Sequence, residues 1–262
     1  MRLLRTSHLG PTLMVTLVSY LLALRFWWEG PSYVIAFTVF CGQLVVGWTN
    51  DLVDLPLDQK EGRTNKPMVD GKLSPTTVKR ATWVALVFVT LFSLFGPMGL
   101  IGGLVHLLGV GSGVAYNFYF KSNRFSLLPY AISFAALPAS ITLSRNEVPQ
   151  LWLLISGSCL GVAAHFANVV KDMERDRAAG IMGLPQILGS RKSTLLSGLL
   201  LFLVSIQIYF VNKTILVLIL GAIGFSLLLL PARFRFIAVM ALALLDVIAL
   251  VSAMPVSPNY AA

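Results

Sequence analysis

The chain has 262 residues, of which 56% are hydrophobic and only 12% are charged, and its mean hydropathy is +0.80. A soluble domain carries roughly 25% charged residues, so this composition excludes a soluble enzyme or binding module and indicates a membrane protein. The net charge of +9 fits basic loops beside anionic lipid, and no nucleic-acid partner is expected. Both cysteines, Cys41 and Cys159, stand inside apolar runs, which predicts core residues and not a disulfide or a zinc site.

Apolar runs long enough to cross a bilayer, about 20 residues each, recur along the chain. They predict one membrane domain over 1–262 with about nine spans. The first run lacks a small-residue cleavage site, so we expect a retained span and not a removed signal. Tight turns are predicted at Glu29-Gly30-Pro31 and at Gly96-Pro97. The predicted spans are 12–28, 31–49, 77–95, 97–115, 126–143, 149–169, 193–211, 214–231 and 235–252.

The basic residues predict the orientation of these spans. With a cytoplasmic N-terminus and alternating spans, the 20 Lys and Arg residues all fall on the cytoplasmic side except Arg25, Arg145 and Lys213. The two long charged connections, 50–76 and 170–192, lie on that same side. The sequence therefore predicts a multi-pass protein of the cell membrane whose active site opens to the cytoplasm.

Two acidic segments stand where the second and sixth predicted spans end. Residues four apart stack on one helix face with a rise of about 6 Å, so each segment predicts a stripe of one amide and two carboxylates. Neighbouring carboxylates repel each other, and a helix C-terminus disfavours anions, which together favour a bound cation. Hard oxygen ligands favour Mg²⁺. The first motif reads Asn50, Asp51, Asp54 and Asp58, and the second reads Asn168, Asp172 and Asp176.

Basic residues flank both motifs, and a metal ion together with Lys or Arg is how proteins hold a diphosphate. The alternative for the acids is ordinary solvated loop residues, and for the bases ordinary cytoplasmic loop charge. Two matched stripes, each led by Asn, favour the metal interpretation. Pro56 is expected to break or kink the end of the first stripe, which makes Asp58 its least secure ligand. The basic residues concerned are Arg63, Lys66, Lys72, Lys121, Lys171, Arg175 and Arg177.

Four segments, in this order and context, carry a family resemblance: NDLVDLPLD (50–58), GRTNKPMVDGKLS (62–74), AYNFYFKSNRFSLLPYA (115–131) and NVVKDMERDRAAGIMGLPQILG (168–189). With them the whole chain resembles the UbiA superfamily of intramembrane prenyltransferases. The resemblance implies an all-α bundle of about nine transmembrane helices around a central cavity, with two cytosolic cap loops. It also implies that both motifs, Asp51 included, bind Mg²⁺ and through it a prenyl diphosphate. The residues it places at the diphosphate are Arg63, Lys66, Lys121 and Tyr116.

The predicted reaction ionises an isoprenyl diphosphate and transfers the prenyl group to a small lipophilic acceptor, most suitably an aromatic ring. Cyclisation of the prenyl chain without an acceptor, as in UbiA-type terpene cyclases, needs the same motifs and stays open. A transporter is less favoured, because its acids would lie near mid-membrane and not at helix ends. We predict catalytic roles for Asp54, Asp172, Asp176 and Lys121, and a diphosphate contact for Arg175 as well.

Other polar and aromatic residues have more than one interpretation. The candidates for an acceptor contact are His8, Arg5 and His165. Interfacial anchoring is the simpler interpretation of His8, and a helix–helix hydrogen bond suits His165 equally well. We expect a packing or helix–helix role for His106. Asp246 is a candidate functional residue, because acids inside a membrane span are costly. Aromatic faces can stabilise a carbocation, and the candidates for that role are Trp48, Tyr116, Phe118, Tyr119, Tyr130 and Phe134.

Overall fold

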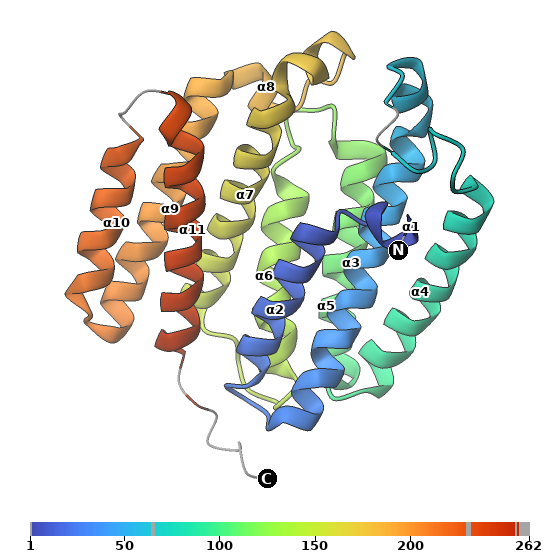
Figure 1. Ribbon diagram of the computed structural model, residues 1–262. Coiled ribbons are helices and arrows are strands. Elements are labelled where there is room, and N and C mark those ends of the chain that lie inside the picture. The colour runs from blue at the N-terminus through green and yellow to red at the C-terminus, as the bar shows by residue number, and fades with distance from the viewer. Residues whose placement is uncertain (1, 64–65, 229–231, 255, 257–262) are drawn as a thin grey trace. The chain divides into compact units, whose positions relative to one another are not determined.

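The computed structural model describes residues 2–63, 66–228, 232–254 and 256, with their side chains apart from those of Arg5 and residues 232–236. All regular secondary structure in this part of the chain is helical (Figure 1). The Arg5 side chain, an acceptor candidate, therefore lies outside the described residues. The chain forms two compact units, one within Met1–Phe118 and Ala139–Val148, the other within Tyr119–Pro138 and Pro149–Val256.

The first unit is organised around its longest helix, α3, against which α2, α4 and α5 pack. A turn of π-helix, η1, directly continues α5. Helix α6 begins in the second unit and ends in the first. The bounds are α1 Arg2–Arg5, α2 Leu9–Ala23, α3 Glu29–Lys60, α4 Pro75–Phe95, α5 Gly99–Ala115, η1 Tyr116–Phe120 and α6 Leu128–Leu143.

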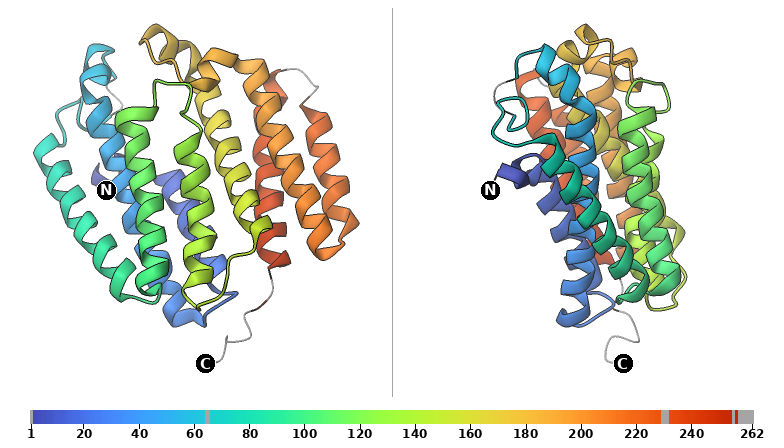
Figure 2. Two further views of the ribbon diagram at one scale, coloured as in Figure 1. Left: turned by 180° about the vertical axis from the view of Figure 1, so that it is seen from behind. Right: turned by 90° about the vertical axis from the view of Figure 1, so that its right-hand side faces the viewer.

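The second unit is organised around α9, which packs against α7, α10 and α11. Figures 1 and 2 show α9, α10 and α11 side by side from opposite directions. The short helix α8 packs against the ends of α7 and α9. The bounds are α7 Leu151–Ala178, α8 Leu184–Leu188, α9 Ser190–Asn212, α10 Ile215–Leu227 and α11 Ala232–Ala253.

Each predicted span coincides with one helix of the described chain, so the predicted all-helical membrane fold is confirmed. Among the residues that the structure describes, five helical segments are long and apolar enough to cross a membrane: α3, α4, α5 with η1, α7 and α9. The apolar helices α2, α6, α10 and 237–253 of α11 are shorter. The turn predicted at Glu29-Gly30-Pro31 is wrong, because these residues form the first turn of α3, where proline is tolerated.

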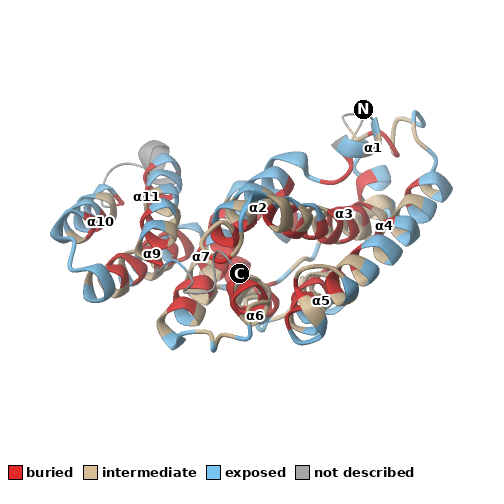
Figure 3. Ribbon diagram, turned by 90° about the horizontal axis from the view of Figure 1, so that it is seen from below, coloured by how far each residue is buried: buried red, intermediate tan, exposed pale blue. Residues whose placement is uncertain are grey.

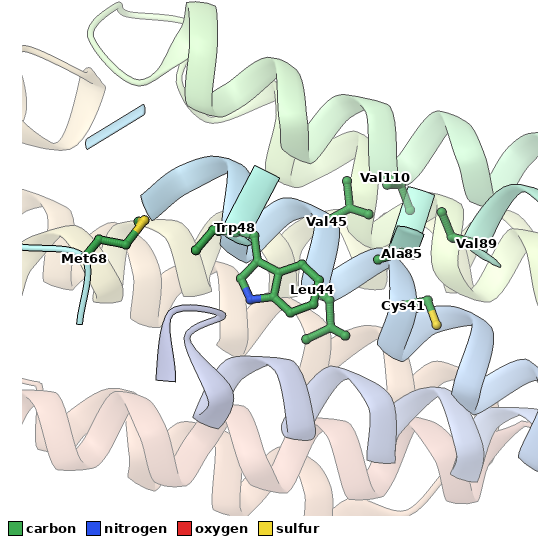
Figure 4. Close-up of a cluster of buried hydrophobic side chains, with 9 residues drawn as sticks. Cys41, Leu44, Val45, Trp48, Met68, Ala85, Val89 and Val110 are labelled. Atoms are coloured by element: carbon green, nitrogen blue, oxygen red, sulfur yellow. The ribbon is translucent and has the colours of Figure 1, made fainter. Parts of the chain in front are cut away.

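Apolar side chains both fill the helix contacts and cover the outer faces. In the first unit, Leu44 and Trp48 of α3 pack with Val89 of α4 and Val110 of α5 (Figure 4). Cys41 belongs to this cluster, as predicted. Figure 3 shows exposed residues along α4 and α10. Many of them are large and apolar, such as Trp83, Phe88 and Phe95 on α4, as expected of helix faces that meet lipid in a membrane protein.

Two buried polar groups inside the spans form hydrogen bonds between helices. His106 Nδ1 of α5 lies 2.8 Å from Ser93 Oγ of α4, which confirms its predicted packing role. Ser205 of α9 donates a hydrogen bond of 2.6 Å to Asp246 Oδ1 of α11. Asp246 is fully buried, and its second oxygen has no hydrogen-bond partner among the described residues. The structure thus gives Asp246 an interhelical contact.

Replacing Gly103 with alanine is expected to destabilise the protein by about 2 kcal/mol, the usual size of an overpacking defect. A Cβ atom at this α5 position would lie 2.0 Å from the backbone oxygen of Ser93, so α4 and α5 would have to separate. Gly111 is the matched control on the same helix, since its Cβ would meet nothing within 4 Å. Unfolding in detergent should show a loss for Gly103→Ala and none for Gly111→Ala; equal stability of the two variants would contradict the packing argument.

Candidate functional site

The first acidic motif forms the last turns of α3. The expected break at Pro56 is wrong, because α3 continues through this proline to Lys60. Proline removes one backbone hydrogen bond, and the neighbouring bonds and packed side chains hold the remaining turn. Asp58 is therefore a helical residue on the same element as Asn50 and Asp54.

The motif divides between two faces of this helix. Each four-residue step advances about 40° around the axis, so Asp58 lies nearer in direction to Asp51 than to Asn50. The exposed fractions of Asp51 and Asp58 are only 4% and 3%. Asn50 and Asp54 are half-buried, and the Asn50 amide donates to Asp54 Oδ2 at 3.1 Å. The single stripe predicted from the spacing is therefore two pairs, one half-buried and one buried.

The buried pair is held by basic residues from the following loop. Lys66 Nζ lies 2.9 Å from Asp51 Oδ1 and 2.6 Å from Asp58 Oδ2. Arg63 Nη1 lies 3.0 Å from Asp58 Oδ1. Burial alone would lower the pKa of Lys66, but its hydrogen bonds and charge interactions with Asp58 and Asp51 raise it overall. Lys66 therefore stays protonated, and both predicted diphosphate contacts lie at the carboxylates of the motif itself.

The N-terminal segment packs against the same helix end. Trp48 donates its indole N–H to the Leu3 carbonyl at 2.9 Å, so this predicted cation-facing aromatic belongs to the core. Gly47 gives the segment room, since a Cβ there would lie 2.5 Å from the Ser7 oxygen. His8, in a left-handed conformation, places Nε2 3.4 Å from Asp51 Oδ1. The sequence suggested His8 as an anchor or an acceptor contact, and nothing in its pattern predicted this position.

The π-helical turn η1, which follows α5, carries two further residues near the first motif's helix. Asn117 is buried and donates to the Val46 carbonyl at 2.9 Å and to Thr49 Oγ1 at 3.0 Å. These bonds join the π-helical turn to α3 just before the acidic motif. Tyr116, the predicted diphosphate contact, opens the same turn and is half-buried. Local π-helix often accompanies functional sites.

The second motif forms the last turns of α7, and its residues also differ in their exposure to solvent. Asn168 and Asp172 are exposed, whereas Asp176 is buried. Arg175 Nη1 lies 3.1 Å from Asp172 Oδ1, and its Nη2 lies 3.4 Å from Asp176 Oδ1. Arg175, predicted at the diphosphate, thus lies between two motif carboxylates.

A residue that the sequence did not single out forms a hydrogen bond with the second motif. Gln186 of α8 is buried and donates from Nε2 to Asp176 Oδ2 at 3.0 Å. Lys121 of the same unit is close enough for its charge to act on Asp176. Gln186 stands in the predicted connection 170–192, and a glutamine there carried no signal of a role.

His165 lies on α7, one turn before Asn168, and its side chain contacts other residues of the second unit. It is almost fully buried, and its Nε2 lies 3.0 Å from Ser126 Oγ. The ring of Tyr130 stacks on it with a centroid distance of 4.5 Å. This hydrogen bond of His165 thus goes to the turn before α6 and not to another helix, while its stacking contact is with Tyr130 of α6. The acceptor contact stays a prediction.

The structure does not test the predicted ligation of a metal. No group of three or more His, Cys, Asp or Glu side chains gathers among the residues that the structure describes. The first motif belongs to the first unit and the second motif to the second. The metal roles of both motifs, and the central cavity, therefore remain predictions.

Solved structures similar to the chain are UbiA-type proteins. A digeranylgeranylglyceryl phosphate synthase matches with a TM-score of 0.72, 17% identity and coverage of 96% of each chain. A UbiA homologue from Aeropyrum pernix K1 matches with a TM-score of 0.71 and 14% identity, over 93% of this chain and 98% of that one. A UbiA homologue from Archaeoglobus fulgidus, bound to GPP and Mg²⁺, matches with a TM-score of 0.69 and 14% identity, over 97% and 99%. At these identities the likeness establishes the fold.

The family assignment rests on the sequence as well as on the fold. No curated protein sequence matches the chain. The family model described as the UbiA prenyltransferase family matches residues 12–254, which takes in both acidic motifs and all of the long helices except the first residues of α2. The chain is a multi-pass membrane protein that belongs to the UbiA prenyltransferase family.

Proposed function

We propose that the protein is a Mg²⁺-dependent intramembrane prenyltransferase that ionises an isoprenyl diphosphate and transfers the prenyl group to a small lipophilic acceptor, most suitably an aromatic ring. The observation that carries this proposal is the pair of acidic helix ends, each led by an asparagine. The fold supports it, since one similar structure holds GPP with Mg²⁺ and another holds DMAPP with Mg²⁺.

The chemistry of the donors fits magnesium. Mg²⁺ prefers oxygen ligands and usually takes one or two carboxylates, with water and phosphate completing its shell. Asn50 and Asp54 offer such oxygens at the end of α3, and Asn168 and Asp172 offer them at the end of α7. We assign these four residues as the outward ligands. We propose that the remaining motif acids belong to the site from its buried side and are not outward ligands. These acids are Asp51, Asp58 and Asp176.

The ion's contribution, when bound, is to neutralise charge on the departing diphosphate oxygens. Basic side chains of the protein are proposed to add to this neutralisation. Arg175 and Lys121 in the second unit, and Arg63 and Lys66 in the first, are proposed to balance diphosphate charge, with Tyr116 offering a hydroxyl as hydrogen-bond donor. Because Arg63 and Lys66 are bonded to motif carboxylates, their first effect is to fix those carboxylates.

The proposed reaction breaks the C1–O bond of the prenyl diphosphate heterolytically. Both electrons of this bond leave with the diphosphate, and an allylic cation remains on the prenyl chain. An acceptor carbon supplies the electron pair of the new bond and then releases a proton. The apolar surroundings of the spans exclude water, which would otherwise capture the cation. Of the aromatic candidates, Tyr130 is stacked on His165, while Phe118 and Tyr119 are exposed.

The proposed site opens to the cytoplasm. This orientation follows from the basic residues that accompany both motif ends, and it would give the enzyme access to water-soluble Mg²⁺ and to the charged diphosphate head. The prenyl tail would remain in the apolar interior.

Incubation with Mg²⁺ and geranyl, farnesyl or geranylgeranyl diphosphate, with and without aromatic acceptors, tests the proposal. A prenylated acceptor together with released diphosphate is the expected result. A terpene hydrocarbon or alcohol formed without acceptor would instead identify a cyclase that uses the same motifs. Absence of diphosphate release under all of these conditions, from protein shown to be folded, would overturn the proposed function.

A further inference from the structure

The last carboxylate of each motif is held by the segment that follows it. In the first unit, Asp58 is bound by Arg63 and Lys66 from the loop after α3. In the second unit, Asp176 is bound by Gln186 from the segment after α7. The two motifs therefore repeat an arrangement but differ in its chemistry. The loop partners of Asp58 are cations, whereas the loop partner of Asp176 is a neutral amide, and the cation beside Asp176 is Arg175 of α7 itself, at 3.4 Å.

The amide of Gln186 has one defined orientation. Its side chain is only 2% exposed, and Nε2 donates to Asp176 Oδ2 at 3.0 Å. The amide oxygen is buried and has no hydrogen-bond partner among the described residues. Turning the amide over would place this oxygen against the carboxylate and forfeit the bond. The carboxylate thus gains a donor whose direction is fixed.

The segment that carries Gln186 is fixed from three sides. Arg177 donates to the Gln186 carbonyl, with Nε at 3.0 Å. Ser193 of α9 donates to the Pro185 carbonyl at 3.1 Å. The Leu184 amide donates to Ser126 Oγ at 3.1 Å. These bonds fix the position from which the Gln186 side chain reaches Asp176.

Gly183 makes room for this arrangement. A Cβ atom at residue 183 would lie 2.8 Å from Gln186 Oε1, 2.9 Å from the Lys121 carbonyl and 3.1 Å from Ser126 Oγ. Its φ of −69° is ordinary, so the glycine serves close approach and not an unusual backbone conformation. The Gln186 side chain occupies the space that a larger residue at 183 would take.

We propose that Gln186 is a positioning residue for the second motif, which orients Asp176 through a neutral hydrogen bond and adds no further cation beside that carboxylate. The proposal rests on the proposed Mg²⁺–diphosphate function. A lysine in this place would hold the carboxylate equally well but would add a second cation beside Arg175, as Lys66 adds one beside Arg63 at Asp58. Oriented in this way, Asp176 keeps its attraction for a cation bound at the neighbouring Asp172.

The test uses the full-length protein in detergent, with inorganic diphosphate and Mg²⁺ as the probe and thermal stabilisation as the readout. Partners of metal ligands typically contribute 10–100-fold to metal affinity, so Gln186→Met should raise the half-saturating Mg²⁺ concentration about tenfold. Gln186→Asn, whose amide is one methylene too short, should do the same if the Met variant does not fold. Gln207→Met is the matched control, because Gln207 accepts from Ser156 at 2.9 Å away from the motif, and its Mg²⁺ response should equal that of the wild type.

A double-variant cycle separates positioning from simple packing. If Gln186 acts through Asp176, Gln186→Met should have little further effect on the Mg²⁺ response of Asp176→Asn, whereas independent effects would add. Additive effects, or an unchanged Mg²⁺ response in both Gln186→Met and Gln186→Asn, would overturn the positioning role. A wild-type protein that is not stabilised by Mg²⁺ and diphosphate would instead overturn the proposed function.

Discussion

Replacing Asp54 or Asp172 with alanine is expected to lower kcat/KM for prenyl transfer by about 10³-fold, the loss typical of removing one preorganised electrostatic group. Both carboxylates extend from the last turns of their helices, and Asp172 has 49% of its side chain exposed. Their removal should therefore leave the packed core intact. Initial rates with Mg²⁺, a prenyl diphosphate and an acceptor measure the effect, and thermal unfolding verifies the fold.

The matched control for these variants is Asp70→Ala. Asp70 lies in the loop after α3 and is bonded to Lys72 at 2.8 Å, outside the acidic motif. Its replacement should leave the rate near that of the wild type. Full activity of either Asp54→Ala or Asp172→Ala would show that the altered residue is not a required Mg²⁺ ligand.

Replacing Lys66 with methionine is expected to cost about 3–5 kcal/mol of unfolding free energy, because it removes the cation that two buried carboxylates share and leaves Asp51 with only His8 beside it. Lys66 serves two carboxylates, Asp51 and Asp58, whose side chains are each 4% exposed. Unfolding in detergent without substrate or Mg²⁺ measures the loss. Adding Asp51→Asn to Lys66→Met should recover part of it, since the carboxylate that lost its lysine is removed while Asp58 keeps Arg63.

Lys72→Met provides the comparison for Lys66→Met. The Lys72–Asp70 pair has a similar distance of 2.8 Å, but the Lys72 side chain is 61% exposed. Exposed pairs contribute about 0–1 kcal/mol, so this variant should be nearly as stable as the wild type. Similar losses in the two variants would mean that burial does not govern the Lys66 contacts.

The helices were predictable because long apolar runs carry a strong signal. All nine predicted spans have a helix in the described structure. The ends were less predictable: α3 and α7 continue to Lys60 and Ala178, well beyond their apolar parts. Charged residues there weaken the hydropathy signal, while ion pairs such as Lys66–Asp58 stabilise the final turns.

The acidic motifs were predictable in identity but not in orientation. A spacing of four residues suggested one stripe, yet the helix turns about 40° at each step, which carries Asp58 and Asp176 toward the protein interior. Pro56 was a misleading signal, because one lost hydrogen bond does not end a helix that side chains hold on both sides of it. Lys66 and Arg63 were recognised as basic, but their partners depend on the path of the following loop.

Long-range contacts formed the least predictable part. Trp48 sits among apolar residues in the sequence, and its bond to the Leu3 carbonyl depends on how the N-terminal segment returns to α3. Gln186 likewise reaches Asp176 only because the loop is held by Ser126, Ser193 and Arg177. None of these pairings has a local sequence pattern.

The space at Gly183 has a consequence for how this chain can change in evolution. A Cβ at residue 183 and the amide of Gln186 would compete for one volume, with 2.8 Å between them. Residues 183 and 186 should therefore vary together among related sequences. Where alanine or serine stands at 183, a shorter or apolar residue should accompany it at 186, and those sequences must orient the last acidic residue of the second motif by another donor.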